Sequence, residues 1–379
     1  MELKTEIWAN PVEYLRKKQP DLPVLFCAPA VLHNAAQQFL RGFPGLVTYA
    51  VKANPDELVL SNFAAAGITT YDVASPEEMR IVRSVQPDAV MHYNNPIRSI
   101  SEIEEAVSLG VVSYSVDAQS ELDKLTSRVP QGVEIAVRFK LPVEGAAYNF
   151  GSKFGATPEK AISLLKKVAS AGYSPALTFH PGTQCKDPMA WKSYIEEAAR
   201  ISKEAGVDIK RLNVGGGFPS HRNESHAPQL ETFFDVIRET TKTAFGDKQP
   251  DLICEPGRAL SAEGKSLAVR VKAIRDHDHV FLNDGIYGTL AELPVLGAHD
   301  RVSVISPEGV RRTGSATART LFGPTCDSLD KLPEMQNLPA DLEEGDYLIF
   351  KGFGAYSCAT VTRFNGYGVW SKEVVISFD

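Results

Sequence analysis

The chain has 379 residues, of which 43% are hydrophobic and 23% are charged, and its formal net charge is −7. This balance is typical of a folded globular protein of about two domains and argues against a disordered or fibrous chain. The negative net charge argues against nucleic acid or an anionic membrane as a partner bound through bulk charge, and no apolar run approaches the roughly 20 residues of a membrane helix.

Short apolar runs rich in β-branched residues recur along the first two thirds of the chain, and each predicts a buried strand. The runs are Leu46–Val51, Ile68–Val73, Ala89–Tyr93, Val111–Val116, Val133–Phe139, Ala176–Phe179, Leu212–Val214 and Leu252–Cys254. The stretches between them with apolar residues at helical spacing are Pro55–Ala66, Pro76–Val85, Ser101–Leu109, Thr157–Ala171, Pro188–Ala205 and Gln229–Ala244. Eight strands that alternate with helices predict an α/β fold, a (β/α)8 TIM-like barrel, with an open doubly wound sheet as the alternative.

The pattern changes after about Leu260, where predicted strands follow one another with little helix between them. These strands are Ala268–Ile274, Val280–Leu282, Arg301–Ile305, Tyr347–Phe350 and Val374–Phe378. The segment Lys331–Glu344 is polar and contains prolines, so we predict a surface loop there. The last third of the chain therefore predicts a second, mostly β domain.

The cysteines indicate the compartment in which the protein works. Five of them are scattered along the chain, and no two form a Cys-x-x-Cys pair. The N-terminus also lacks the apolar core of a secretory signal. These features predict reduced thiols, a cytoplasmic protein and no metal site.

Candidate site residues follow all eight predicted barrel strands, and in a barrel the active site lies at these carboxyl ends. The residues are Lys52, Asp72, Asn94, Asp117, Arg138, His180, Gly215–Gly217 and Glu255. A lysine at an apolar strand is costly unless it is neutralised or used covalently. Lys52 therefore has two equal interpretations: a Schiff base with an aldehyde cofactor, or an ion pair with a buried carboxylate.

Three further features bear on the cofactor. The triple glycine Gly215–Gly217, with a helix predicted to follow, would let backbone amides bind a phosphate, although glycine clusters more often make turns. Glu255 could form an ion pair with Arg258 or place a carboxylate beside a heterocyclic nitrogen. Together with Lys52 and His180 on one rim, this combination favours pyridoxal 5'-phosphate.

The order of these motifs resembles the fold-type III pyridoxal-phosphate decarboxylases, the ornithine, lysine and diaminopimelate decarboxylase group, and in particular the bacterial ornithine and lysine enzymes. The motifs are Tyr49–Pro55, Tyr71–Ser75, His180–Gln184, Gly215–Pro219, Glu255–Arg258, Gly323–Asp330 and Gly354–Tyr356. The resemblance implies an alanine racemase-like barrel over residues 28–264 and a β domain built from residues 1–27 and 265–379. It also implies a homodimer with shared active sites.

The resemblance also implies roles for single residues. Lys52 would form the Schiff base, His180 would stack on the cofactor ring, and Glu255 would pair with the ring nitrogen. The residues that match the surroundings of the lysine and the ring are Asp72, Glu78 and Arg138. The other cofactor-binding positions are Thr183, Gly215, Gly216, Gly217, Gly257, Arg258 and Tyr356. Thr183 keeps the hydroxyl group of the serine that the family usually has there.

The substrate-binding positions include one departure from the family. Cys326 and Asp327 match residues that reach into the partner's site, where the cysteine would protonate the carbanion and the aspartate would bind the substrate's distal amine. Tyr287 lies in an Asp-Gly-x-Tyr-Gly motif, but Val295-Leu296 stand where eukaryotic-type ornithine enzymes have a Tyr-Asp pair. Glu292, in a Leu-Ala-Glu segment similar to some bacterial enzymes, would supply the second carboxylate. The alternative is an exposed Glu292 and a substrate other than ornithine.

The resemblance implies decarboxylation of L-ornithine, L-lysine or both to the diamine, in polyamine biosynthesis. Decarboxylation of diaminopimelate, a carboxylated polyamine or a siderophore or antibiotic precursor is the alternative. An amino-acid racemase shares the barrel and the Schiff base, but its ring nitrogen typically faces arginine rather than glutamate. A non-catalytic regulatory homologue would usually have lost the lysine, the glycine cradle or the cysteine, and all three are present here.

Overall fold

A computed structural model gives the fold, and it describes residues 6–143, 151–221, 227–297 and 300–379. The chain forms two compact units. The barrel unit comprises residues 36–219 and 229–259, and the β unit comprises residues 1–35, 220–228 and 260–379. The chain passes between the units after Ala35 and Ala259, where the sequence suggested boundaries near residues 28 and 264, and also on either side of residues 220–228. The first five residues of the predicted N-terminal segment lie outside the described residues.

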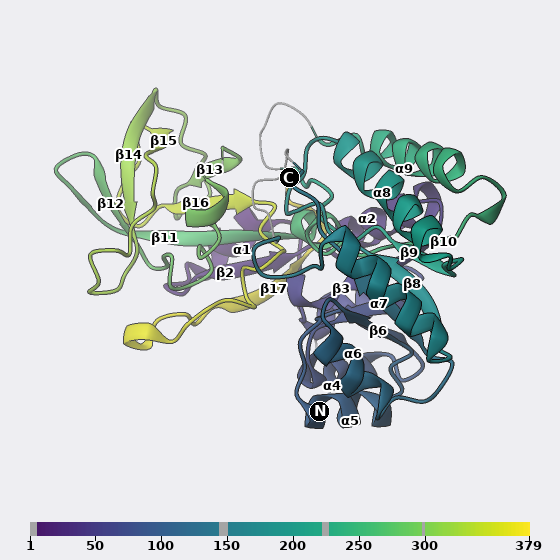
Figure 1. Ribbon diagram of the computed structural model, residues 1–379. Coiled ribbons are helices and arrows are strands. Elements are labelled where there is room, and N and C mark those ends of the chain that lie inside the picture. The colour runs from purple at the N-terminus through teal and green to yellow at the C-terminus, as the bar shows by residue number, and fades with distance from the viewer. Residues whose placement is uncertain (1–5, 144–150, 222–226, 298–299) are drawn as a thin grey trace. The chain divides into compact units, whose positions relative to one another are not determined.

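The barrel unit is a closed parallel barrel, with eight strands among its described residues (Figure 1). The strands are β3 (Leu46–Ala50), β4 (Thr70–Val73), β5 (Val90–Tyr93), β6 (Ser113–Val116), β7 (Glu134–Arg138), β8 (Ser174–Thr178), β9 (Arg211–Asn213) and β10 (Asp251–Cys254). The strands follow chain order around the barrel, and β10 pairs with β3 to close it, with Ile253 opposite Leu46. The predicted barrel is confirmed, and the open sheet is excluded.

Helices connect the barrel strands. They are α3 (Glu57–Ala65), α4 (Pro76–Val85), α5 (Ile100–Ser108), α6 (Gln119–Thr126), α7 (Pro158–Ser170), α8 (Met189–Ala205) and α9 (Leu230–Phe245), and α2 (Pro29–Gly42) precedes β3. The start of α4 follows from its sequence, because Oγ of Ser75 accepts the N–H of Glu78 at 3.3 Å and proline stands at the first helical position. Among the described residues, no helix is both long and apolar enough to cross a membrane.

The end of β3 is held firmly by its neighbours, and this matters for the site. Tyr49 is fully buried, and its ring lies 4.5 Å from the ring of Phe63, measured between centroids. The Tyr49 hydroxyl donates a hydrogen bond to the carbonyl oxygen of Asn54 at 3.0 Å. The bond spans the turn after β3, so the conformation of that turn is fixed by packing in the barrel wall.

The β unit contains one sheet, and segments from both ends of the chain contribute strands to it. Its strands are β1 (Ile7–Trp8), β2 (Val24–Cys27), β11 (Lys265–Arg275), β12 (His279–Leu282), β13 (Val302–Ile305), β14 (Ala316–Phe322), β15 (Gln336–Pro339), β16 (Tyr347–Lys351) and β17 (Ser371–Val375). Strand β11 pairs with β2, β12 and β16, and β17 pairs in parallel with β1 and β2. The β domain completed by the N-terminal segment is confirmed. The helices of this unit, α1 (Pro11–Lys18) and α11 (Leu293–Leu296), are short.

The predicted loop over Lys331–Glu344 is wrong in part, because it contains β15. This strand pairs with β14, with Asn337 opposite Ala318, and in the described part of the sheet it has no second neighbour. Gln336 and Leu338 are buried while Asn337 is exposed. An edge strand with one buried face tolerates polar residues and a proline, so a search for apolar runs misses it.

Candidate active site

Lys52 lies in η1 (Val51–Ala53), a 3-10 turn directly after β3. The strand ends at Ala50, so Lys52 follows it as predicted, and the Lys52 side chain is 47% exposed. Its Nζ lies 3.3 Å from Oδ2 of Asp72, which is buried near the carboxyl end of β4. The predicted ion pair is present, and the half-exposed amine is also accessible to a carbonyl compound.

Glu255 directly follows β10, and its side chain is buried. Its Oε1 accepts hydrogen bonds from the side-chain amides of Asn94 and Asn213. Burial raises the pKa of Glu255, the charge of Asp72 raises it further, and the charge of Lys52 lowers it. The rim thus holds a buried acid whose ionisation depends on its immediate neighbours, as a partner for a ring nitrogen requires.

His180 follows β8, and its Nδ1 accepts the N–H of Gly182 at 3.0 Å. Burial lowers the pKa of His180 well below its ordinary value, and the charges of Arg138 and Lys52 lower it further. The ring is therefore neutral at neutral pH, with its proton on Nε2. A neutral, flat imidazole is suited to stack on a heterocycle.

The three glycines after β9 allow close contact between backbone segments. Gly215 and Gly217 have φ angles of 69° and 85°, and a Cβ at Gly217 would collide with the carbonyl oxygen of Gly182. A Cβ at Gly216 would lie 2.5 Å from the carbonyl oxygen of Glu255. The helix predicted to follow, Gln229–Ala244, is α9, and it begins at Leu230, well after the glycines. The cradle therefore consists of loop backbone and not of a helix N-terminus.

Gly217→Ala should destabilise the barrel by more than about 2 kcal/mol and weaken cofactor binding, because it combines a left-handed φ with a backbone collision. Gly132→Ala is the matched control, since Gly132 has a φ of 83° and a Cβ there would meet nothing within 4 Å. Thermal unfolding and cofactor titration of both variants measure the difference. Equal effects of the two substitutions would contradict the packing argument.

The segment after Glu255 packs on the turn that carries Lys52. The N–H of Ala50 donates to the carbonyl oxygen of Pro256 at 3.3 Å, and a Cβ at Gly257 would lie 2.8 Å from Cβ of Ala53. A side chain at position 257 would push the lysine turn away. This contact fixes Lys52 and Glu255 relative to one another.

The other predicted barrel residues lie on the same rim. Arg138 ends β7, and its guanidinium lies 5.2 Å from the ring centre of Phe154. Thr183 is partly exposed in the loop after β8, and Arg258 is buried at the start of α10 (Arg258–Ser261). The cofactor positions predicted in the barrel sequence therefore all lie at or near the carboxyl ends of its strands.

Glu78 adds a second acid near Lys52. Its Oε2 accepts the N–H of Ala74 at 2.7 Å. Burial raises the pKa of Glu78 from 4.5 to about 7, supported by the charge of Asp72 and opposed by the Ala74 hydrogen bond and by Lys52. Between these pKa values the folded state holds a proton that the unfolded state has released. The free energy of unfolding therefore falls as the pH rises from about 5 to about 7.

Glu78→Gln should remove this decline in the cofactor-free protein, because glutamine keeps an acceptor for Ala74 but does not ionise. The free energy of unfolding of the variant should exceed that of wild type by an amount that grows with pH and reaches on the order of 3 kcal/mol at pH 8. Denaturant unfolding at several pH values measures it. Glu77→Gln, at a neighbouring exposed side chain, is the control and should follow wild type. Parallel pH curves for wild type and Glu78→Gln would contradict the assignment.

Tyr287, Cys326 and Asp327 come together in the β unit. The Tyr287 hydroxyl donates to Oδ2 of Asp327 at 2.5 Å, and the N–H of Leu329 donates to Oδ1 at 2.9 Å. The hydrogen bond from Tyr287 lowers the pKa of Asp327, and the bond from Leu329 acts in the same direction. Cys326 is exposed, and its N–H donates to Oδ1 of Asn365 at 3.0 Å.

Asp330 explains why these two motifs lie together. Its Oδ1 accepts the N–H of Ile286 at 3.0 Å, and its Oδ2 accepts the N–H and the hydroxyl of Thr325 at 3.0 and 2.7 Å. The aspartate is buried. It therefore holds the Asp-Gly-x-Tyr-Gly motif against the Gly-Pro-Thr-Cys-Asp motif. The spacing of the two motifs along the chain does not reveal this contact.

Two further predicted residues belong to the β unit. Glu292 is half-buried and directly precedes α11, in which Val295 is 62% exposed. Tyr356 has a φ of 57°, in the left-handed region, and follows Gly354, where a Cβ would collide with the carbonyl oxygen of Ser261. A non-glycine residue in this conformation is strained, and such strain is concentrated at functional sites.

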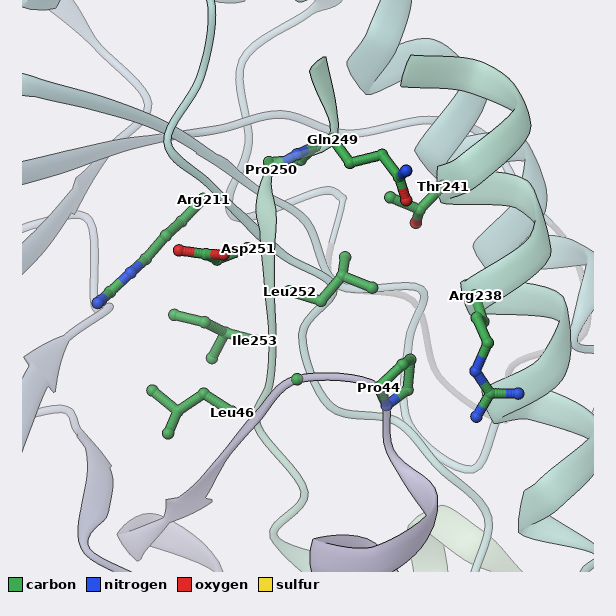
Figure 2. Close-up of a pocket in the computed structure, with 11 residues that line it drawn as sticks. Pro44, Leu46, Arg211, Arg238, Thr241, Gln249, Pro250, Asp251, Leu252 and Ile253 are labelled. Carbon is green, nitrogen blue, oxygen red and sulfur yellow. The ribbon is translucent and has the colours of Figure 1, made fainter. Parts of the chain in front are cut away.

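A pocket of about 420 Å³ lies at the opposite end of the barrel strands (Figure 2). Leu46, Arg211 and Asp251, the first residues of β3, β9 and β10, line it. In Figure 2 the side chains of Arg211 and Arg238 point away from one another. The amino-terminal face of such barrels contributes to stability, and the carboxyl-terminal face carries catalysis. The rim with Lys52 is therefore the candidate active site.

Two amides on the rim were not among the residues predicted to bind cofactor or substrate. Asn94 was noted only as a residue after the third strand, and Asn213 was read as part of the seventh. Both donate to Glu255. Their position at the carboxyl ends of strands is the signal that could have identified them.

The fold and the rim define a class of protein. An accessible amine, a buried carboxylate and a cradle in which a Cβ would collide with backbone fit the aldehyde, ring nitrogen and phosphate of pyridoxal 5'-phosphate. These are the features of barrel enzymes that use this cofactor. The family model for pyridoxal-dependent decarboxylases, described as their pyridoxal-binding domain, matches residues 30–262, and the chain belongs to this family. It is a pyridoxal-phosphate-dependent amino-acid decarboxylase.

Individual relatives agree over nearly the full length. Decarboxylase flvG of Aspergillus flavus is 31% identical over 92% of this chain and 84% of its own. The lysine/ornithine decarboxylase of Selenomonas ruminantium is 30% identical over 94% and 90%. The crystal structure of lysine decarboxylase from Selenomonas ruminantium is 27% identical, covers 98% of this chain and 97% of its own, and superposes with a TM-score of 0.83.

Proposed function

We propose that the protein decarboxylates a basic amino acid, L-ornithine, L-lysine or both, to the diamine. The observation that carries this is the carboxylate of Asp327. Hydrogen bonds from Tyr287 and Leu329 hold it, and they lower its pKa, so that it stays ionised at neutral pH. An oriented, ionised carboxylate suits a distal ammonium group. The relatives named for lysine and ornithine support the same substrate class.

The barrel residues would serve the cofactor, which when bound supplies an electron sink for the electron pair released as CO2 leaves. Lys52 would hold it covalently through Nζ, and the backbone amides of Gly215–Gly217 would bind its phosphate. Glu255 would keep a proton on the ring nitrogen. The neutral ring of His180 would pack on its face. These residues fix the ring so that the bond to the carboxylate can be aligned for cleavage.

We further propose a homodimer in which Cys326 and Asp327 of one copy serve the Lys52 site of the other. The exposed thiol and the backbone N–H bond to Asn365 support this, because they leave Cys326 accessible in a fixed loop. The thiol would donate its proton to Cα after CO2 has left. Lys52 would hold the cofactor whenever neither substrate nor product is attached to it.

The test is CO2 release by the cofactor-loaded protein from a panel of single substrates. The panel contains L-ornithine, L-lysine, L-arginine, 2,4-diaminobutyrate, meso-diaminopimelate and carboxylated polyamines. We expect turnover of ornithine, lysine or both. Turnover of only a larger or acidic substrate would overturn the substrate assignment and leave the reaction class intact. Loss of optical activity in a substrate without CO2 release would identify a racemase instead.

A further inference from the structure

We propose that Asn94 and Asn213 are positioning residues that orient Glu255 toward the cofactor's ring nitrogen, and that Asn213 also couples Glu255 to the phosphate cradle. This inference rests on the role proposed above for Glu255. It concerns two side chains that the assigned cofactor positions do not include.

The three side chains come from three separate strand ends. Asn94 follows β5, Asn213 ends β9 and Glu255 follows β10. All three are buried, with 8%, 5% and 7% of their surfaces exposed. Strands β9 and β10 are neighbours, whereas β3 and β4 lie between β10 and β5 in the barrel. Asn94 therefore reaches across the mouth of the barrel, and closure of the barrel is what brings the two amides to one carboxylate.

The hydrogen bonds of Asn213 fix which end of its side-chain amide faces Glu255. Oδ1 of Asn213 accepts the N–H of Gly215 at 2.9 Å, so its Nδ2 donates to Oε1 of Glu255. The backbone carbonyl of Asn94 accepts the hydroxyl of Ser115 at 2.8 Å, and its Nδ2 donates to the same Oε1. A carboxylate held by two donors on one oxygen has a fixed plane, which directs Oε2. Asn213 thus contacts both Glu255 and the cradle.

These donors also act on the charge of Glu255. Hydrogen bonds to a carboxylate favour its ionised form, and burial and the charge of Asp72 oppose it. Lys52 and Arg138 are the cations that favour it. Without the amides, Glu255 would turn more readily and hold its own proton. Its interaction with a protonated ring nitrogen would then be lost.

The backbone gives Asn213 a second effect that Asn94 lacks. The N–H of Glu255 donates to the carbonyl oxygen of Gly215 at 2.8 Å, so both polar groups of this glycine are bound at the same junction. A change at Asn213 that removes its Oδ1 frees the Gly215 N–H. It should therefore disturb phosphate binding, whereas a change at Asn94 should not.

The experiment compares two probes in the full-length apoprotein: pyridoxal 5'-phosphate, and its 1-deaza analogue, in which carbon replaces the ring nitrogen. Direct titration gives both affinities, and inorganic phosphate, measured by competition, tests the cradle separately. Asn94→Ala should lower the affinity for the cofactor about tenfold and leave those for the analogue and phosphate within about twofold of wild type. Asn213→Ala should weaken all three.

Asn213→Asp separates the two bonds of Asn213. When ionised, aspartate keeps an acceptor for the N–H of Gly215, offers no donor to Glu255 and adds a negative charge beside it. We expect loss of the preference for the cofactor over its analogue. This variant also keeps the proposal testable if Asn213→Ala does not fold, as checked by thermal unfolding.

Ser113→Ala is the matched control, because Ser113 donates to the Glu134 carboxylate at 2.7 Å at the other end of the barrel strands. It should change neither preference nor affinity. Equal weakening of cofactor and analogue by Asn94→Ala, or no weakening of either, would overturn the positioning role. If wild type itself shows no preference, and Glu255→Gln changes nothing, the proposed role of Glu255 has failed instead.

Discussion

Lys52→Ala should reduce the rate of CO2 release at least ~10⁴-fold, because it removes the amine that would hold the cofactor covalently. The visible absorbance band of the lysine-bound cofactor should disappear as well. The lysine lies in a turn directly after β3, and the buried ring and hydroxyl of Tyr49 hold this turn in place. A shift of the backbone therefore does not compensate for the lost amine. Activity assays and absorbance spectra of the purified variant measure both effects.

The substitution also leaves Asp72 without its ion-pair partner, and this needs a control. Lys52→Arg keeps a positive charge beside Asp72 but cannot form the covalent link. It should fold like wild type and be as inactive as Lys52→Ala. Lys167→Ala, which removes a surface lysine bonded to Gln119, should leave rate and spectrum unchanged. Substantial turnover by Lys52→Arg would sink the assignment.

Cys326→Ala should retain the cofactor and slow amine formation by about 10²- to 10⁴-fold, since it removes the proposed acid and leaves the barrel rim intact. Without that acid, some turnovers should place the proton on the cofactor instead of on Cα, so that water releases an aldehyde and the amino group stays on the cofactor. Separate measurement of CO2, diamine and aldehyde reveals the diversion. Cys358→Ala should behave like wild type. A wild-type product ratio for Cys326→Ala would mean that another group donates the proton.

Mixing the two inactive variants tests whether sites are shared. If Lys52 and Cys326 act from different copies, a heterodimer of Lys52→Ala and Cys326→Ala has one site with both residues intact. Activity should then return after joint refolding to about a quarter of the wild-type value. No recovery in a protein shown to be mixed would contradict a shared site.

The sequence was sufficient for the barrel because its strands are short apolar runs with site residues at their ends. The prediction failed where a segment keeps its structure only because it pairs with another part of the fold. Strand β15 is polar and was missed, because it is held along one edge by β14. The convergence of Asn94 and Asn213 on Glu255 was also invisible, because it depends on barrel closure and not on spacing along the chain.

In the candidate active site, too, single residues were predictable from the sequence, whereas contacts between distant segments were not. The motifs around Lys52, His180 and Glu255 were each readable, since a lysine, histidine or acid after an apolar run is conspicuous. The clamp that Asp330 forms between Ile286 and Thr325 was not, although its motif was recognised. Buried hydrogen bonds between distant segments are a property of the folded chain.

The position of β17 between β1 and β2 sets the order in which the two units can finish folding on the ribosome. All strands of the barrel have been synthesised before residue 255. By contrast, Ile7 and Val24 can pair with Val374 and Ser371 only after those residues have been synthesised. The barrel can therefore close during synthesis, while the N-terminal strands keep open edges until translation has passed residue 375. Open strand edges recruit other chains. A chain truncated before Ser371 should thus aggregate despite an intact barrel sequence.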